Sequence, residues 1–187
     1  ITNCIITENN GYSSIIHIDR SDVTISKTLI SDNTCTNSSN SYGAIVTYYD
    51  VNLNINKCTI AENTRSGLFS YDNGVHIIEN TIFVNPDASE EIGRRSSSAT
   101  MTISYSHFNL EPAGCESSVY DCENNWYNGA NVGSSWYFYD NYIPRINNLN
   151  NHGNPDADGD GVSWVNDPDD QDPDGTRLDI GAYHYPF

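Results

Sequence analysis

Four aspartates and a valine near the C-terminus have the types and spacing of a calcium-binding loop. Residues 156–162 read Asp-Ala-Asp-Gly-Asp-Gly-Val, and a further Asp follows at 167. A twelve-residue calcium loop places acidic oxygens at positions 1, 3 and 5, a glycine at 6, a carbonyl ligand at 7 and an acid at 12. The sequence therefore predicts calcium bound by Asp156, Asp158, Asp160, Val162 and Asp167.

Two features separate this loop from the usual pattern. The last ligand position holds Asp167 instead of a bidentate Glu, and no flanking helices are evident. The alternative is an acidic turn without an ion. However, residues 152–187 contain nine Asp and one Arg, and such a concentration of like charge is self-repelling without a cation. This charge balance favours calcium.

The cysteines divide into two groups. Cys115 and Cys122 lie seven positions apart in a stretch rich in Gly, Ser and Asn. That spacing predicts a local disulfide, which suits an oxidising compartment, and two free thiols are the alternative. Cys4 and Cys58 recur at the same place in a sequence repeat, and we interpret them as small buried hydrophobic residues.

Lys27 and Lys57 are the candidates for catalysis, because they share one position in two adjacent repeats. Removal of a proton next to a carboxylate needs a cation that neutralises the carboxylate and a basic side chain that takes the acidified proton. No carboxylate cluster accompanies the two lysines, and no Ser-His-Asp or Cys-His arrangement can be recognised from spacing. We favour solvated charges at turns and assign no catalytic residue.

Two features point to carbohydrate. The triplet Asn37-Ser38-Ser39 is an N-glycosylation sequon in a polar, predicted surface loop, with Asn37 as the acceptor if the source organism glycosylates Asn. Tyr48, Tyr49 and Tyr71 are aromatic side chains that could stack on sugar rings. The aromatic residues of 126–142 are better explained as a cap over the core.

Composition excludes several classes of function. The 187 residues include 25 acidic and 8 basic side chains, for a net charge of -17. Nucleic acid is excluded as a partner because phosphate binding needs clustered Lys and Arg. Membrane insertion is also excluded, since no apolar run reaches the roughly 18 residues that a span requires. The chain opens in the middle of a repeat, at Ile1, which suggests processing or truncation.

These candidate sites must be held by a repetitive scaffold. Segments 1–10, 25–34, 55–64, 77–86 and 103–112 align without gaps. Their sixth position predicts one continuous buried stack of Ile6, Ile30, Ile60, Ile82 and Phe108, and their first position holds Ile1, Ile25, Ile55, Ile77 and Ile103. Two residues earlier stand Val23, Leu53, Val75 and Met101, as in a half-buried strand. Repeats of this length predict a solenoid of short strands.

One further column of the alignment holds asparagine. Asn9, Asn33, Asn63 and Asn85 occupy the ninth position of successive segments. Asparagine tolerates the left-handed turn conformation, and its amide can bond to the repeats above and below. We therefore expect a ladder of asparagines at a turn.

The pattern I-x-N-C-x-I-x-x-N of residues 1–9 resembles the right-handed parallel β-helix repeat of the pectate lyase-like superfamily. Residues 172–183 resemble the close of β-helix domains in large secreted bacterial surface proteins. The resemblance implies export, neighbouring anchoring modules and, in most such domains, no assigned activity. The superfamily also contains polysaccharide lyases, hydrolases and epimerases, so the fold leaves the function open.

We therefore expect an all-β, right-handed parallel β-helix of about five coils with an irregular acidic C-terminal cap. The expected divisions are 1–111 for the coils, 112–151 for an aromatic cap and 152–187 for the calcium segment. The expected function is that of a secreted, extracellular or cell-surface structural module, such as an adhesin or filament, stiffened by calcium. A calcium-dependent lyase on acidic glycans is the alternative. Expected partners are other copies, or preceding coils, at the N-terminal end, with carbohydrate as a further candidate.

Overall fold

The computed structural model describes residues 1–37, 42–71, 73–95, 98–109, 112–116, 120–127, 153–156, 160–171, 177 and 180–181. Within these ranges the protein is built of β-strands, with one four-residue helix, α1 (Ala113–Glu116), and one 3-10 turn at Pro168–Asp170. None of the described helices is long and apolar enough to cross a membrane.

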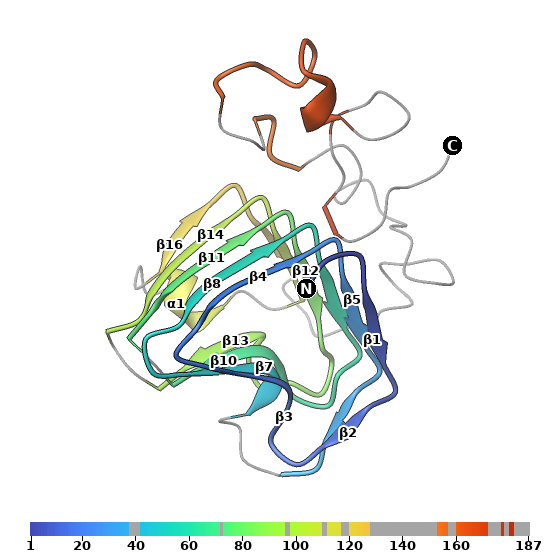
Figure 1. Cartoon of the computed structure of the whole chain (residues 1–187), viewed down its shortest axis with the longest axis vertical. Coiled ribbons are helices and arrows are strands. Elements are labelled where there is room, and N and C mark those ends of the chain that lie inside the picture. Colours follow the sequence, from blue (N-terminus) through green and yellow to red (C-terminus); the bar gives the residue numbers. More distant parts are fainter. Residues whose placement is uncertain are drawn as a thin grey trace.

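Three parallel sheets contain most of the strands (Figure 1). The first sheet orders β1 (Ile5–Thr7), β5 (Leu29–Ser31), β9 (Thr59–Ala61), β12 (Ile82–Val84), β15 (His107–Phe108) and β17 (Trp126–Tyr127). The second orders β3 (Ser14–Asp19), β7 (Gly43–Tyr48), β10 (Ser66–Ser70) and β13 (Ile92–Arg94). The third orders β4 (Asp22–Ser26), β8 (Asn52–Asn56), β11 (Val75–Glu79), β14 (Thr100–Ser104) and β16 (Asp121–Glu123).

The chain visits the three sheets in turn, and each passage is called a repeat below. Neighbouring strands in a sheet therefore come from successive repeats, and their pairing is parallel throughout. A short parallel pair, β2 (Asn10–Gly11) and β6 (Thr34–Cys35), lies between the first and second sheets. This all-β arrangement of parallel sheets is compatible with a parallel β-helix. Strands β16 and β17 extend it within the stretch that the sequence assigned to a cap.

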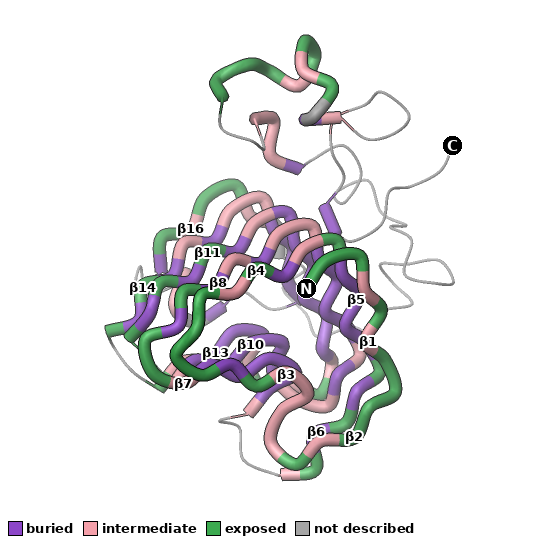
Figure 2. Tube along the Cα trace, viewed as in Figure 1, coloured by how far each residue is buried: buried purple, intermediate pink, exposed green. Residues whose placement is uncertain are grey.

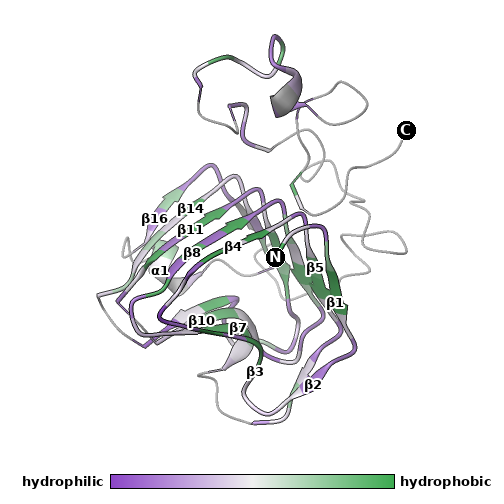
Figure 3. Cartoon of the chain, viewed as in Figure 1, coloured by the Kyte–Doolittle hydropathy of each residue, from purple (hydrophilic) through white to green (hydrophobic). Residues whose placement is uncertain are grey.

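The core lies between the sheets (Figures 2 and 3). Alternate residues of a strand face opposite sides of a sheet, so one side chain in two points inward. The inward columns are buried and apolar: Ile30, Ile60, Phe83 and Phe108 in the first sheet, Ile45, Leu68 and Ile92 in the second, and Ile25, Ile55, Ile78 and Ile103 in the third. Each column gains a new layer with each repeat, which is how single short strands are stabilised.

The register of the fourth repeat differs from the sequence prediction by one residue. Ile55 pairs with Ile78, and Ile60 pairs with Phe83. The predicted first column is therefore wrong at Ile77, which is 44% exposed, and the predicted stack is wrong at Ile82. A slip of one residue moves a side chain to the other face of the sheet. Phe83 fills the place in the stack and lies on Phe108, with ring centroids 5.2 Å apart.

The same slip replaces an apolar residue of the core by a histidine. Leu53 pairs with His76, and His76 pairs with Met101, so the expected position of Val75 was also wrong. His76 is buried, and its Nε2 lies 3.0 Å from the Ser70 hydroxyl. Val75 is instead exposed on the outer face.

The hydrogen-bonded ladder of asparagines is confirmed, but a left-handed backbone conformation at these asparagines is not. The Nδ2 atoms of Asn9, Asn33 and Asn63 each donate to the side-chain oxygen of the next asparagine, at 3.0, 2.9 and 2.9 Å. The left-handed residue precedes the asparagine: Glu8, Asp32 and Glu62 have φ of 58°, 55° and 54°. The expectation that the asparagines themselves adopt this conformation was wrong.

The ladder also explains the slip in register. Glu62 separates Ala61 from Asn63, whereas Val84 is followed directly by Asn85. Ala61 pairs with Val84, and Asn63 bonds to Asn85. The fourth repeat thus omits the left-handed residue of this turn. An alignment without gaps that matches the asparagines necessarily misplaces the strand residues before them.

Candidate functional site

The acidic loop begins with a turn that resembles the start of a calcium loop. The Oδ2 atom of Asp156 accepts a hydrogen bond from the Gly161 amide at 3.1 Å, and the Oδ1 atom of Asp160 accepts one from the Val162 amide at 2.7 Å. Gly161 has φ of 82°, a conformation that favours glycine. The first and sixth positions of the predicted loop are therefore in direct contact.

Asp156 also provides the test of whether a cation fits. Its Oδ1 atom is buried and has no hydrogen-bond partner among the described residues. A buried carboxylate oxygen without a donor is destabilising unless something positive contacts it. A hard cation such as calcium, which takes oxygen ligands, satisfies that requirement.

The remaining predicted ligands are only partly described. The Asp167 amide donates to the Trp164 carbonyl at 3.4 Å, and the Trp164 amide donates to the Pro155 carbonyl at 3.0 Å, which brings the end of the loop back to its start. Asp158 lies outside the described residues. Among those described, no three His, Cys, Asp or Glu side chains cluster closely enough to hold a metal ion.

Asn154 attaches this loop to the sheets, and the sequence did not reveal that role. Its amide nitrogen donates to Asn80 Oδ1 at 2.6 Å, its Nδ2 donates to Glu79 Oε1 at 2.7 Å, and its Oδ1 accepts from the Asp156 amide at 3.1 Å. Burial raises the pKa of Glu79, while Asn154, Ser104 and Lys57 act in the opposite direction. The loop thus rests on the turn after β11.

A second contact joins the C-terminal segment to the same turn. The Gly181 amide donates to the Asn80 carbonyl at 2.8 Å. A side chain at position 181 would collide with Ile82, and Ile180 is buried. Gly181 therefore lies against the outer face of the first sheet at Ile82, an outward isoleucine that is buried.

The two lysines stand at turns. Lys27 and Lys57 have φ of 49° and 54°, and their amides donate to the Asn56 and Glu79 carbonyls. Asn80 occupies the next place in this column with φ of 50°. The charge of Lys57 lowers the pKa of Glu79, so one carboxylate lies near one of the two lysines. Among the described residues no set of catalytic groups converges there.

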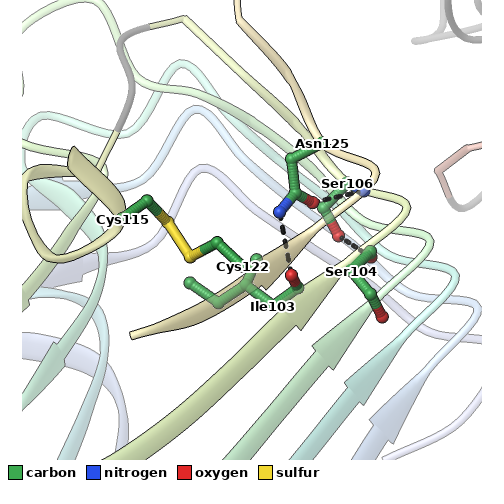
Figure 4. The surroundings of a disulfide bond; sticks show 6 residues. All are labelled: Ile103, Ser104, Ser106, Cys115, Cys122 and Asn125. Carbon is green, nitrogen blue, oxygen red and sulfur yellow. Dashed lines mark hydrogen bonds between the residues drawn. A yellow bond between two sulfur atoms is a disulfide. The ribbon is translucent and has the colours of Figure 1, made fainter. Parts of the chain in front are cut away.

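The predicted cysteine pair lies together at the end of the core (Figure 4). Cys115, in α1, and Cys122, in β16, form a disulfide with Cα atoms 5.7 Å apart. Cys122 pairs with Ile103, so the disulfide closes the inward column of the third sheet. Beside it, Asn125 accepts from the Ser106 amide at 2.9 Å and donates to the Ile103 carbonyl at 2.8 Å. These contacts cover the last described repeats.

The other cysteines and the sequon have structural surroundings. Cys58 is fully buried, and burial raises its pKa to about 12, so it behaves as an inert thiol. Cys4 is half-buried. Asn37 is half-buried, and its backbone bonds to Tyr12 and Arg65. The other two residues of the sequon, Ser38 and Ser39, lie outside the described residues.

Comparisons with protein-family models, with curated proteins and with solved structures give no match.

Proposed function

We propose that the protein is an extracellular structural module, a right-handed parallel β-helix of the pectate lyase-like type whose C-terminal segment is held in place by calcium. The observation that carries the proposal is the attachment of the acidic loop by Asn154, next to the buried Asp156 oxygen, which has no partner in the described part of the chain. An ion in this loop would order the segment that covers the first sheet. The module would serve as a rigid support for surface loops, as in an adhesin or a filament.

Calcium would be held by the carboxylates of Asp156, Asp158, Asp160 and Asp167 and by the Val162 carbonyl. Its charge would offset part of the net charge of -17. Binding to the folded state alone stabilises that state by about 2.7 kcal/mol when free calcium is 100 times Kd. For a chain of this size the melting temperature would rise by about 5–10 °C.

The test measures bound calcium and thermal unfolding of the full chain with calcium and with excess chelator. Wild-type protein should bind calcium and lose several degrees of melting temperature on chelation. Asp156→Asn should show neither effect. Asp87→Asn, which neutralises an exposed carboxylate outside the loop, should behave as wild type. An identical melting curve with and without chelator, together with no bound calcium, would overturn the proposal.

The edge formed by β1, β3 and β4 supports the proposed partner, a further repeat from a preceding segment or from another copy. The inward residues Ile6 and Val23 of these strands are only half-buried, whereas Ile30 and Leu53 below them are buried. Open strand edges pair readily with other strands. Light scattering over a concentration range should detect self-association, and Val23→Lys should abolish it.

The lyase alternative is separated by one assay. Incubation with a panel of uronate polymers, followed by absorbance of unsaturated products, should give no product for a structural module. Turnover that is lost in Lys57→Ala would establish the enzyme instead.

A further inference from the structure

Four tyrosines and an arginine line an open pocket on the outer side of the second sheet. The pocket has a volume of about 410 Å³ and is lined by Tyr42, Tyr48, Tyr49, Tyr71 and Arg95. It is called the tyrosine pocket below. Tyr48 ends β7, and Tyr71 and Arg95 follow β10 and β13. Because Thr47, Ser70 and Arg94 are register partners, the residues after them lie one above another.

The base of the tyrosine pocket is a stack of rings that runs across the repeats. Tyr48 lies on Tyr71 with ring centroids 4.6 Å apart and planes at 8°. His17 lies on the opposite face of Tyr48, at 4.8 Å and 17°. The faces of Tyr48 are thus occupied, and its edge carries the hydroxyl. Burial, followed by neighbouring phenols, raises the pKa of Tyr48 to about 12, so this hydroxyl stays protonated and can donate hydrogen bonds.

Tyr49 is exposed at the turn after β7. Its side chain is 56% exposed, and it has φ of 58°, followed by Asp50 with φ of 51°. Arg20, the corresponding residue of the preceding repeat, has φ of 47°, so this left-handed turn belongs to the repeat. Arg20 covers one face of the Tyr49 ring, with the guanidinium carbon 4.3 Å from the centroid. The exposed Tyr49 ring therefore contributes nothing to the packing of the hydrophobic core.

Arg95 supplies positive charge to the tyrosine pocket. Its guanidinium carbon lies 5.6 Å above the Tyr71 ring. Arg20, by contrast, forms an ion pair with Asp19 at 3.3 Å, so its charge is already compensated. The pocket therefore combines flat apolar rings, phenolic hydroxyls and a guanidinium.

We propose that the tyrosine pocket binds a pyranose unit of an acidic oligosaccharide, that is, one that carries a carboxylate. The apolar C–H face of the sugar packs on the exposed ring of Tyr49. The sugar hydroxyls form hydrogen bonds with the phenolic hydroxyls, as the amphipathic tyrosine side chain allows. The carboxylate pairs with Arg95, whose planar guanidinium suits carboxylates. The volume lies within the range of small-ligand pockets. None of these contacts involves the acidic loop.

The test measures binding of the full chain to an array of acidic and neutral oligosaccharides, followed by calorimetry with the best acidic ligand and its neutral counterpart. We expect binding of the acidic ligand, with an affinity about tenfold lower in Tyr49→Ala. Arg95→Gln should lower the affinity for the acidic ligand about tenfold and leave the neutral one unchanged.

The matched controls are Tyr12→Ala, which removes a tyrosine that is 73% exposed elsewhere, and Lys27→Gln, which removes an exposed charge. Both should bind as wild type. Binding should persist in chelator, which separates this site from the acidic loop and from the proposed role of calcium. No binding to any acidic saccharide, equal binding of neutral and acidic ligands, or full affinity in Tyr49→Ala would each overturn the proposal.

Discussion

Two buried titratable groups should give the protein opposed dependences of stability on pH. Glu91 is fully buried, and burial raises its pKa from 4.5 to about 7, although Asn85 donates to both carboxyl oxygens at 2.7 Å. A carboxyl group with a raised pKa stabilises the fold at pH below its ordinary value, and this contribution is lost as pH rises through about 7. At about 1.4 kcal/mol per pH unit the effect is about 3 kcal/mol.

His107 works in the other direction. It is buried, and burial lowers its pKa from 6.5 to about 4. Its contribution to stability is present above 6.5 and is lost as pH falls through about 4, again about 3 kcal/mol. Between about pH 4.5 and 6.5 the contributions of Glu91 and His107 to stability change in opposite directions. The free energy of unfolding of the wild type, measured against pH, therefore reveals neither.

Single substitutions should separate the two dependences. The free energy of unfolding is measured by urea denaturation between pH 4 and 8 for wild type, Glu91→Gln and His107→Gln, with fluorescence and circular dichroism as coincident probes. The stability advantage of wild type over Glu91→Gln should shrink by about 3 kcal/mol as pH rises. Its advantage over His107→Gln should grow by about 3 kcal/mol over the same range. Differences that do not vary with pH would refute the assigned burial of both groups.

Five further substitutions, which make three separate tests, probe the fold in the same urea assay. Asn63→Ala should lower the free energy of unfolding by about 3 kcal/mol, because it leaves the buried donors of Asn33 unpaired. Asn9→Ala, at the exposed end of the ladder, should lower it by less than about 1 kcal/mol. Equal losses in the two variants would argue against the ladder. Ile78→Asp should lower the free energy of unfolding by at least about 4 kcal/mol, and Ile77→Asp by less than about 1 kcal/mol, because only Ile78 is buried. The reverse order would support the register that the sequence predicted. Cys122→Ser, which removes the disulfide, should cost about 2 kcal/mol, and an unchanged midpoint under oxidising conditions would contradict its role in closing the core.

The periodic part of the fold could be predicted because the same position in each repeat requires the same type of residue. The inward isoleucines and the asparagine ladder were found in this way. The register of the fourth repeat could not, because Ile77 and Ile78 are equally apolar, as are Ile82 and Phe83. Periodicity cannot choose between adjacent apolar residues, and only the missing left-handed residue before Asn85 decides the register.

The candidate site was predictable only in its local part. The spacing of Asp156 and Gly161 is encoded within six residues and is matched by their hydrogen bond. The contact of Asn154 with Glu79 joins residues 75 positions apart, so no local spacing encodes it. The tyrosine pocket depends on stacking of residues from successive repeats, so Tyr48 and Tyr71 could be named from sequence but Arg95 could not be added to them.

The asparagine ladder has a direction. In each hydrogen bond between asparagines the Nδ2 atom donates to the asparagine of the following repeat, and the series ends at Glu91, whose two carboxyl oxygens both accept from Asn85. The ladder is therefore a row of aligned dipoles with an acceptor as its terminus at one end and the side-chain oxygen of Asn9 at the other. A further repeat can lengthen the row only by donating to Asn9. Any polymer built by extending this ladder would grow from a single end.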